Sequence, residues 1–195
     1  MNIELEAKFV NINPDEIRAK LKNLGARLIY KERQMRRKVY KHKTEYDNDW
    51  FRVRDEGDRI TLSYKKLTDR SLYGTKEIMF VVPDFEQACR FLESAHLKNT
   101  NYQETKREMW NLGSIEVTID TWPWIPTFLE IEGKDEEEIK NVALKLGLNW
   151  DDVLHGSVEN VYAMNYNITE EEVCDWPEIK FIDIPEWLEK KKKIF

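Results

Sequence analysis

Charged side chains recur on one face of several predicted strands, and their types suit chemistry on a polyanion. The alternating sequence from Ile3 to Phe9 places Glu4, Glu6 and Lys8 on one face of a strand. The same spacing of two recurs in three later segments, in Arg52 and Arg54, in Thr61, Ser63 and Lys65, and in Glu130 and Glu132. One such strand can simply face water. Four of them indicate a shared charged interior.

The chemistry of these side chains indicates what such an interior would bind. Carboxylate oxygens are hard ligands that Mg²⁺ and Mn²⁺ prefer, and guanidinium and ammonium groups bind phosphate oxygens. A cluster of enclosed charges is costly unless it is wet, liganded or internally paired. We therefore expect a compact polyanion that binds together with divalent metal ions.

Apolar periodicity predicts the elements that must position these residues. Strands are predicted near residues 2–10, 26–42, 50–55, 59–67, 74–82, 102–111, 114–121 and 127–132. Helices are predicted near residues 13–25, 84–97, 135–146 and 156–166. About eight antiparallel strands would close on themselves and turn their charged faces inward together. The predicted fold class is α+β, a closed antiparallel β-barrel of about eight strands with helices packed outside.

The pattern changes near residue 147, which predicts two parts. Residues 1–147 would form the barrel domain, and residues 148–195 a helical or irregular C-terminal extension packed on the barrel through its aromatic side chains. Residues 134–195 hold 8 Lys/Arg and 15 Asp/Glu, so the acidity behind the net charge of −6 is mostly C-terminal. The final Lys190–Lys193 run is interpreted as a solvated end.

Composition also limits the classes of partner and the location. The chain has no long basic stripe, which argues against general nucleic-acid binding, and no apolar run near the roughly 20 residues of a membrane span. Its start lacks the basic and apolar regions of a signal peptide. Two widely separated cysteines suit a reducing compartment. We expect a cytoplasmic protein with a small-molecule substrate and no membrane partner, and its oligomeric state is left open.

Five charged motifs, in order along the chain, resemble those of the CYTH superfamily. These triphosphate tunnel metalloenzymes include class IV adenylyl cyclases, thiamine triphosphatases and inorganic triphosphatases. The motifs are Ile3–Phe9 with its ExExK pattern, Trp50–Arg54, Leu62–Lys65, Thr105–Glu108, and Ile119–Asp120 with Leu129–Gly133. The resemblance spans residue 3 to about residue 147.

The resemblance implies a barrel tunnel that holds a triphosphate and two Mg²⁺ or Mn²⁺ ions. The implied metal ligands are Glu4, Glu6, Asp120, Glu130 and Glu132. The implied triphosphate-binding residues are Lys8, Arg52, Arg54, Lys65 and Arg107, of which Arg54 and Lys65 are also assigned as catalytic.

The resemblance does not decide whether the triphosphate is hydrolysed or cyclised. Hydrolysis of the terminal phosphoryl group is favoured, because a triphosphate clamp suffices for it. The alternative is a class IV adenylyl cyclase, which forms cyclic AMP and pyrophosphate from ATP and also needs an adenine pocket. A second alternative is a non-catalytic module that binds polyphosphate or a nucleotide. The sequence identifies neither the general base nor the physiological triphosphate.

Strand alternation separates some neighbours and leaves others undecided. Thr105 and Arg107 share one face, so Lys106 would point out of the barrel. In the fifth strand, alternation does not decide whether Lys76 or Glu77 faces inward. Arg36 and Lys38 would share a face, with Arg37 opposite, and this run suits either the barrel mouth or a solvated edge. The loop from Trp122 to Trp124 is interpreted as packed on the barrel end, with stacking on a substrate ring as the alternative.

Overall fold

The computed structural model describes residues 2–42, 48–69, 71 and 73–193, with the backbone alone at residues 2–4. The strands are β1 (Asn2–Phe9), β2 (Arg27–Lys41), β3 (Asp49–Asp55), β4 (Ile60–Leu67), β5 (Thr75–Val82), β6 (Lys98–Leu112), β7 (Ile115–Thr121), β8 (Phe128–Gly133) and the short β9 (Glu178–Ile179). The helices are α1 (Pro14–Asn23), α2 (Phe85–Ser94), α3 (Glu136–Lys145), the 3₁₀ helix η1 (Trp150–Asp152), α4 (Glu159–Asn165), α5 (Glu170–Cys174) and α6 (Glu186–Glu189).

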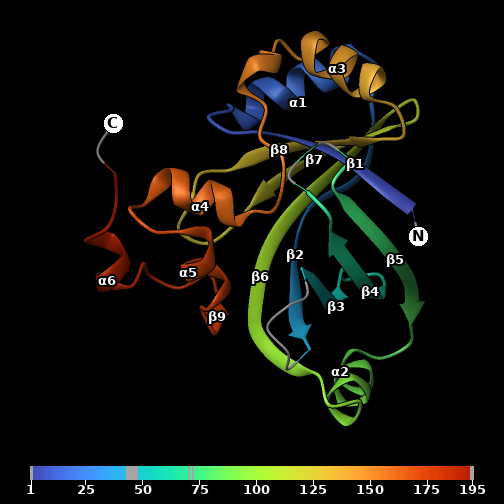
Figure 1. Cartoon of the computed structure of the whole chain (residues 1–195). Helices are drawn as coiled ribbons and strands as arrows, with labels where there is room; N and C mark the ends of the chain where they lie inside the picture. Colours follow the sequence, from blue (N-terminus) through green and yellow to red (C-terminus); the bar gives the residue numbers. More distant parts are fainter. Residues whose placement is uncertain (1, 43–47, 70, 72, 194–195) are drawn as a thin grey trace.

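The first eight strands form one antiparallel, strongly curled sheet (Figure 1). They pair in the order β2-β3-β4-β5-β1-β8-β7-β6, and β6 pairs again with β2, so the pairing returns to its start. The predicted α+β class and the eight-stranded antiparallel barrel are confirmed. The shortest ladder of the ring joins β5 to β1, where only Asn2–Glu4 and Thr75–Glu77 pair.

Two helices cover the outer face of β1, β7 and β8 at one end of the barrel (Figure 1). Asn13 caps α1 by accepting hydrogen bonds from the next turn's N–H groups, and Asp135 caps α3 in the same way. Their apolar stripes pack on the sheet in a cluster that includes Leu5, Ala7, Phe9, Ile17, Leu21, Val117, Ile119, Leu129, Ile131, Ile139 and Ala143. Because side chains alternate along a strand, this packing turns the charged residues of β1 and β8 toward the interior.

A second cluster fixes the opposite end of the sheet. Phe85, Cys89 and Leu92 of α2 pack beneath the barrel, where Tyr40 and Val53 belong to the same buried cluster. Val53 is fully buried on the outer side of β3. Its neighbours on both sides, the arginines of the strand, therefore point inward.

The C-terminal extension lies along β6 and the β7–β8 connection (Figure 1). β9 pairs parallel with β6, and a third apolar cluster joins the extension to the barrel through Trp122, Phe128, Tyr162 and Trp176. The Tyr162 hydroxyl donates to the Pro123 carbonyl at 2.8 Å. The Trp122–Trp124 loop is thus packed against the extension.

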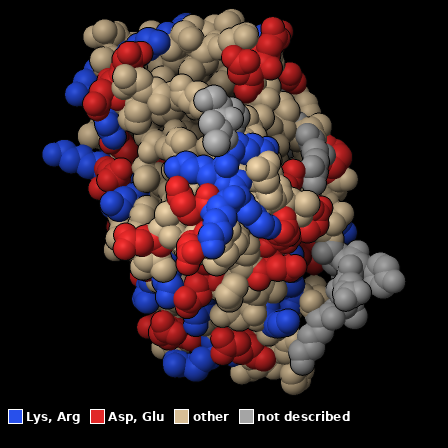
Figure 2. All heavy atoms as spheres, turned by 90° about the vertical axis from the view of Figure 1, so that its left-hand side faces the viewer, with Lys and Arg blue, Asp and Glu red and all other residues tan. Residues whose placement is uncertain are grey.

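The terminal lysines lie among acids. Figure 2 shows Lys and Arg gathered in the middle of the face that carries the extension, with Asp and Glu close around them. Lys190 pairs with Glu186 at 2.7 Å, and Lys191 pairs with Glu172 at 2.9 Å.

Among the helices of the described chain, none is long and apolar enough to cross a membrane.

Candidate functional site

A cavity of about 410 Å³ opens inside the barrel, and its wall is densely charged. The charged residues that line it are Glu6, Lys8, Arg37, Lys41, Asp49, Arg52, Arg54, Arg59, Lys65, Glu77, Arg107, Glu116, Glu130, Glu132, Glu159, Glu170 and Glu171. This volume lies in the range of small-ligand sites. The cavity therefore combines the size of a ligand site with an unusual density of both charges.

The sequence-predicted residues meet at this cavity. Those that line it are Glu6, Lys8, Arg52, Arg54, Lys65, Arg107, Glu130 and Glu132. Asp120 is buried beside Arg107 and contacts it without lining the cavity. The side chain of Glu4 lies outside the described residues, although its backbone pairs with Thr75.

One side of the cavity is cationic and comes from β2, β3 and β4. Arg37 on β2 lies opposite Arg54 on β3, and Lys65 lies on β4, which pairs with the other edge of β3. Arg37 donates through Nε to the Gln103 amide oxygen at 2.5 Å, and its guanidinium lies 4.3 Å from the Trp122 ring centre. Burial, followed by the charges of Arg52 and Arg54, lowers the pKa of Arg37 well below its usual value. Positive charge is therefore concentrated on this side of the cavity.

A buried carboxylate holds Arg54 in place. Glu56 accepts from Arg54 at 2.5 and 2.9 Å and from Arg59 at 2.8 Å. Glu56 is only 1% exposed. Burial alone would raise the pKa of Glu56, but the charges and hydrogen bonds of Arg54 and Arg59 outweigh it and lower this pKa to about 2. Glu56 thus stays ionised and fixes the guanidinium that it contacts.

The facing side of the cavity is acidic and comes from β1, β8 and β7. Glu6 lies directly opposite Glu132 across β1 and β8, and Glu116 lies opposite Glu132 across β8 and β7. All three line the cavity. Like charges directly opposite each other destabilise a sheet, and burial raises the pKa of Glu116. This row has the oxygen chemistry that a divalent cation would neutralise.

Between the two sides, a network of ion pairs joins Lys8, Arg107, Asp120 and Glu130. Arg107 contacts Asp120 at 2.7 Å and Glu130 at 2.6 Å, and Lys8 lies 3.4 Å from Glu130. Burial raises the pKa of Asp120 to about 6 despite Arg107. Against the effect of burial, Lys8 and Arg107 lower the pKa of Glu130 to about 2.

Lys8 also ties the network to the rest of the chain. It pairs with Glu6 on its own strand and donates to the Gly156 carbonyl of the extension at 2.7 Å. In the part of the chain that the structure describes, no three His, Cys, Asp or Glu side chains are already gathered as a metal-binding group.

The structure decides two of the pairs that strand alternation left open. Glu77 faces inward and lies 3.4 Å from Arg52 and 3.7 Å from Lys65. In the second strand it is Arg37 that lines the cavity, and Lys38 lines a groove on the outside.

Lys106 lies outside the barrel, as alternation predicted. Its ammonium is 5.0 Å from the ring centre of Phe181 in the extension. Arg107, the next residue, lines the cavity. The two faces of β6 are therefore separated at this point as expected.

Some cavity residues were not found by sequence reasoning. Glu116 shares the two-residue spacing of Thr118 and Asp120, and this alternation could have identified it. Glu159, Glu170 and Glu171 come from short helices of the extension, where no sequence signal pointed to them.

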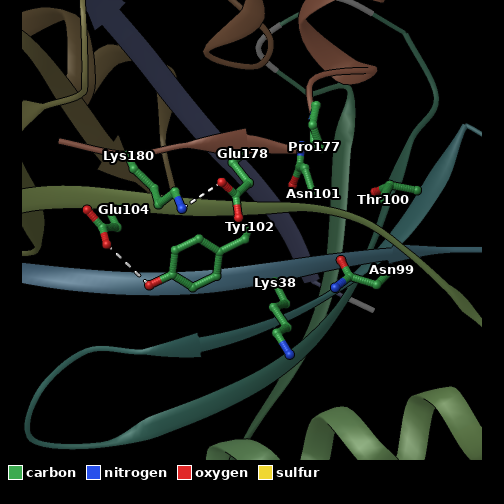
Figure 3. A pocket seen from close by; sticks show the side chains of 9 residues that line it. All are labelled: Lys38, Asn99, Thr100, Asn101, Tyr102, Glu104, Pro177, Glu178 and Lys180. Carbon is green, nitrogen blue, oxygen red and sulfur yellow. Dashed lines mark hydrogen bonds and ion pairs between the residues drawn. The ribbon is translucent and has the colours of Figure 1, made fainter. Parts of the chain in front are cut away.

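An open groove on the outside of β2 and β6 is the other candidate (Figure 3). It forms where β9 joins the barrel, and the labelled side chains come from β2, β6 and the extension. Tyr102 donates to Glu104 at 3.3 Å, and Lys180 pairs with Glu178 at 2.6 Å. Only four charged residues of the described chain line this groove, Lys38, Glu104, Glu178 and Lys180, so it offers a ligand fewer charges than the barrel interior.

Comparisons with known proteins agree with this geometry. A family model described as the CYTH domain matches residues 2–149. The PH1012 protein from Pyrococcus horikoshii is 23% identical, with a TM-score of 0.66 over 77% of this chain and 94% of that chain. A protein from Vibrio parahaemolyticus, described as a candidate adenylate cyclase, is 14% identical with a TM-score of 0.72, over 83% and 98% of the two chains.

A third structure with the same fold carries a different description. A protein from Hippeastrum, described as a candidate adenylyl cyclase with a dominant triphosphatase activity, is 13% identical with a TM-score of 0.55, over 80% and 91% of the two chains. At these identities the likeness concerns the fold. No functionally curated protein matches the chain.

Proposed function

Because the chain belongs to the CYTH domain family, we propose that it is a divalent-metal-dependent enzyme that hydrolyses a triphosphate bound in the barrel cavity. Members of this family are triphosphatases or adenylyl cyclases. The family assignment covers residues 2–149, and we propose that the catalytic unit is the barrel of residues 1–147. The extension that we propose for residues 148–195 contributes Glu170 and Glu171 to the cavity wall.

The observation that carries the proposal is the division of one cavity into a cationic and an acidic side. Arg37, Arg52 and Arg54 come from β2 and β3, and the row of Glu6, Glu132 and Glu116 faces them from β1, β8 and β7. A simple anion binder gains nothing from carboxylates beside its ligand. A site for a triphosphate with a divalent cation uses both sides.

The cations bind and orient the triphosphate. Arg52, Arg54, Lys65, Arg107 and Lys8 donate charge-assisted hydrogen bonds to phosphate oxygens, and the guanidiniums among them can each donate two. Because Glu56 holds Arg54 from behind, little side-chain freedom is lost when that arginine contacts a phosphate. These donors neutralise charge that develops on the phosphoryl oxygens during transfer.

The acidic residues fit a divalent ion by their donor chemistry. Glu6, Glu130 and Glu132 line the cavity with hard carboxylate oxygens and would hold Mg²⁺ or Mn²⁺, with Asp120 and Glu4 as further participants. We propose two ions. When bound, they would supply charge neutralisation on the triphosphate and an activated water. Lys8 and Arg107 now contact Glu6, Glu130 and Asp120, so these cations exchange carboxylate partners for phosphate when the site fills.

Hydrolysis is favoured over cyclisation because the charged wall of the cavity explains how a triphosphate binds, and this suffices for hydrolysis. Cyclisation also needs a pocket for adenine. Cyclisation of ATP is the second candidate. Trp50, Leu67 and Met79 also line the cavity and give it some apolar surface that a base could contact.

The deciding experiment follows products from two substrates. The purified protein is incubated with tripolyphosphate or ATP, with Mg²⁺, Mn²⁺ or a chelator, and orthophosphate, pyrophosphate and cyclic AMP are resolved. We expect orthophosphate release that requires a divalent ion. Cyclic AMP with pyrophosphate would establish the cyclase instead, and tight tripolyphosphate binding without turnover would establish a non-catalytic module.

A pair of variants ties the activity to the cavity. Arg52→Ala removes a cation from the cavity wall, and Lys38→Ala removes one from the outer face of the neighbouring strand. Activity should fall at least about tenfold in the first, since one charged hydrogen bond is lost. It should be unchanged in the second. Equal losses would show that the cavity is not the site.

A further inference from the structure

The edge of β1 that faces away from β8 has two successive partners. β5 pairs with this edge only over Asn2–Glu4. Farther along β1, the Lys8 N–H donates to the Leu154 carbonyl at 3.0 Å, and the Leu154 N–H donates to the Lys8 carbonyl at 2.9 Å. Because both main-chain groups of Lys8 bond to Leu154, its pair with Glu130 on β8 is not hydrogen-bonded, and Leu154 lies on the opposite edge. The C-terminal extension therefore continues the row of partners along β1 where the β5 ladder has ended.

The turn that follows Leu154 brings main chain of the extension into the cavity wall. Asn160 of α4 donates through its side-chain amide to the His155 carbonyl at 2.8 Å. Gly156 has a φ of +96°, a backbone conformation that residues with a Cβ rarely adopt. Gly156 and the two residues after it line the cavity. A glycine at this position thus lets the turn follow the wall closely.

The Gly156 carbonyl is one of three acceptors around the Lys8 ammonium. This ammonium lies 2.7 Å from the carbonyl oxygen, contacts Glu6 on its own strand and lies 3.4 Å from Glu130. Lys8 is only 3% exposed, and an ammonium has three N–H donors. The two carboxylates belong to the proposed metal-binding set, whereas the carbonyl does not. The carbonyl therefore stays an acceptor for Lys8 when the site fills, and two N–H groups remain for phosphate oxygens.

We propose that residues 154–156 complete the triphosphate site, with Gly156 as a positioning residue that aims the Lys8 ammonium into the cavity. The proposal rests on the proposed function, because it takes Lys8 as a ligand of the triphosphate. It adds to the site a segment that lies beyond the matched family domain, which ends at residue 149. The extension then serves as part of the binding site as well as packing on the barrel.

Replacing Gly156 with alanine tests this positioning. A Cβ at Gly156 would lie 3.9 Å from the Asn160 amide nitrogen, which is an ordinary contact, so Gly156→Ala strains the turn through φ and not through a clash. We expect tripolyphosphate affinity, measured by calorimetry at fixed Mg²⁺ and salt, to fall about tenfold, because Lys8 loses its anchored position.

The matched control is Gly25→Ala at the end of α1. Gly25 has a φ of +77°, and a Cβ added there would meet nothing within 4 Å. This substitution also strains a left-handed residue, but Gly25 does not line the cavity. Its tripolyphosphate affinity should match the wild type. An equal loss in both variants would overturn the proposal, because backbone strain in general would account for it.

A double-mutant cycle shows whether Gly156 acts through Lys8. Lys8→Met removes the ammonium and should weaken tripolyphosphate binding roughly ten- to hundredfold. Adding Gly156→Ala to Lys8→Met should then change the affinity by less than about twofold. The proposal is overturned if Gly156→Ala costs about tenfold in both backgrounds. It is also overturned if Gly156→Ala alone leaves the affinity unchanged.

Hydrogen exchange of the ligand-free wild type tests the arrangement without a substitution or a triphosphate. The amides of Lys8 and Leu154 bond to each other's residue, so both should be protected. Unprotected exchange at either amide overturns the proposal even if a variant fails to fold. If both amides are protected but the wild type binds no tripolyphosphate, the proposed function fails and the role of Lys8 fails with it, while the docking of Leu154 on β1 stands.

Discussion

Replacing Arg37 should change the affinity for triphosphate and leave the stability of the ligand-free protein nearly unchanged. This side chain lies in the cavity wall beside the guanidiniums of Arg52 and Arg54, and its pKa is lowered by burial and by those neighbours. A charge that the fold disfavours is expected where an anion later compensates it. We therefore expect Arg37→Met to weaken triphosphate binding without destabilising the ligand-free protein.

The size of each effect follows from the contacts of Arg37. A charge-assisted hydrogen bond to phosphate contributes about 1.5–3 kcal/mol, which corresponds to roughly a ten- to hundredfold change in dissociation constant. In the ligand-free protein, the substitution loses the hydrogen bond to Gln103 and the contact with the Trp122 ring. It also removes repulsion from two guanidiniums, and methionine still packs on the indole. The net change in unfolding free energy should stay within about 1 kcal/mol.

The matched control is Arg36→Met, on the opposite face of the same strand. Arg36 is 45% exposed and pairs with Asp55 at 3.2 Å and Glu86 at 3.8 Å. Both substitutions remove one positive charge, so long-range electrostatic effects on the ligand are similar. Tripolyphosphate binding by calorimetry should change for Arg37→Met and not for Arg36→Met, at fixed Mg²⁺ and salt. Urea unfolding without ligand measures stability.

Two results would refute this reasoning. If Arg37→Met lost several kcal/mol of stability while its affinity was unchanged, Arg37 would be a structural residue. If the two variants lost affinity equally, general electrostatic attraction rather than a placed guanidinium would account for binding.

Three further predictions use the same cavity. Arg107→Ala should lower tripolyphosphate affinity roughly ten- to hundredfold by calorimetry, whereas Lys106→Ala should change it less than about fivefold, and equal losses would contradict the assignment of the two faces. Glu130→Gln or Glu132→Gln should abolish turnover and leave the circular dichroism spectrum unchanged, and wild-type turnover at limiting Mg²⁺ would exclude that carboxylate as a ligand. Glu56 has a folded pKa of about 2 against an ordinary 4.5, so its contribution of about 3 kcal/mol is complete above pH 4.5 and is lost as pH falls toward 2. Urea unfolding of Glu56→Gln should lack this acid dependence, and a profile like the wild type's would contradict the pairing with Arg54.

Strand alternation was enough to predict which charged residues share a face. Arg52 and Arg54 flank Val53, whose burial outside the barrel follows from its own apolar side chain. The same local rule placed Arg107 inward and Lys106 outward, as the structure has them. Such predictions need no knowledge of distant strands, because the period of two is a property of the strand itself.

Alternation could not choose a face where both residues are polar. At Lys76 and Glu77 neither side chain marks the core, so the choice depends on the neighbouring strand. The register of β4 with β5 sets Glu77 opposite Lys65, and this pairing brings the carboxylate to the inner face. Glu170 and Glu171 lie on a helix too short to show a period, and only tertiary packing brings them to the cavity.

The position of β1 in the ring affects how this protein folds during its synthesis. Glu6 and Lys8 lie on the first strand of the barrel and are made before its other strands, yet their partners Glu132 and Glu130 lie on the last strand of the ring. Closing so long a loop carries an entropic cost before any contact repays it, and such non-local pairing makes folding slow. A nascent chain on the ribosome therefore holds Glu6 and Lys8 without their β8 partners until Phe128–Gly133 emerges. The acidic side of the cavity is complete only when the first strand has docked on the last, so ligand binding requires a barrel in which β1 and β8 are paired.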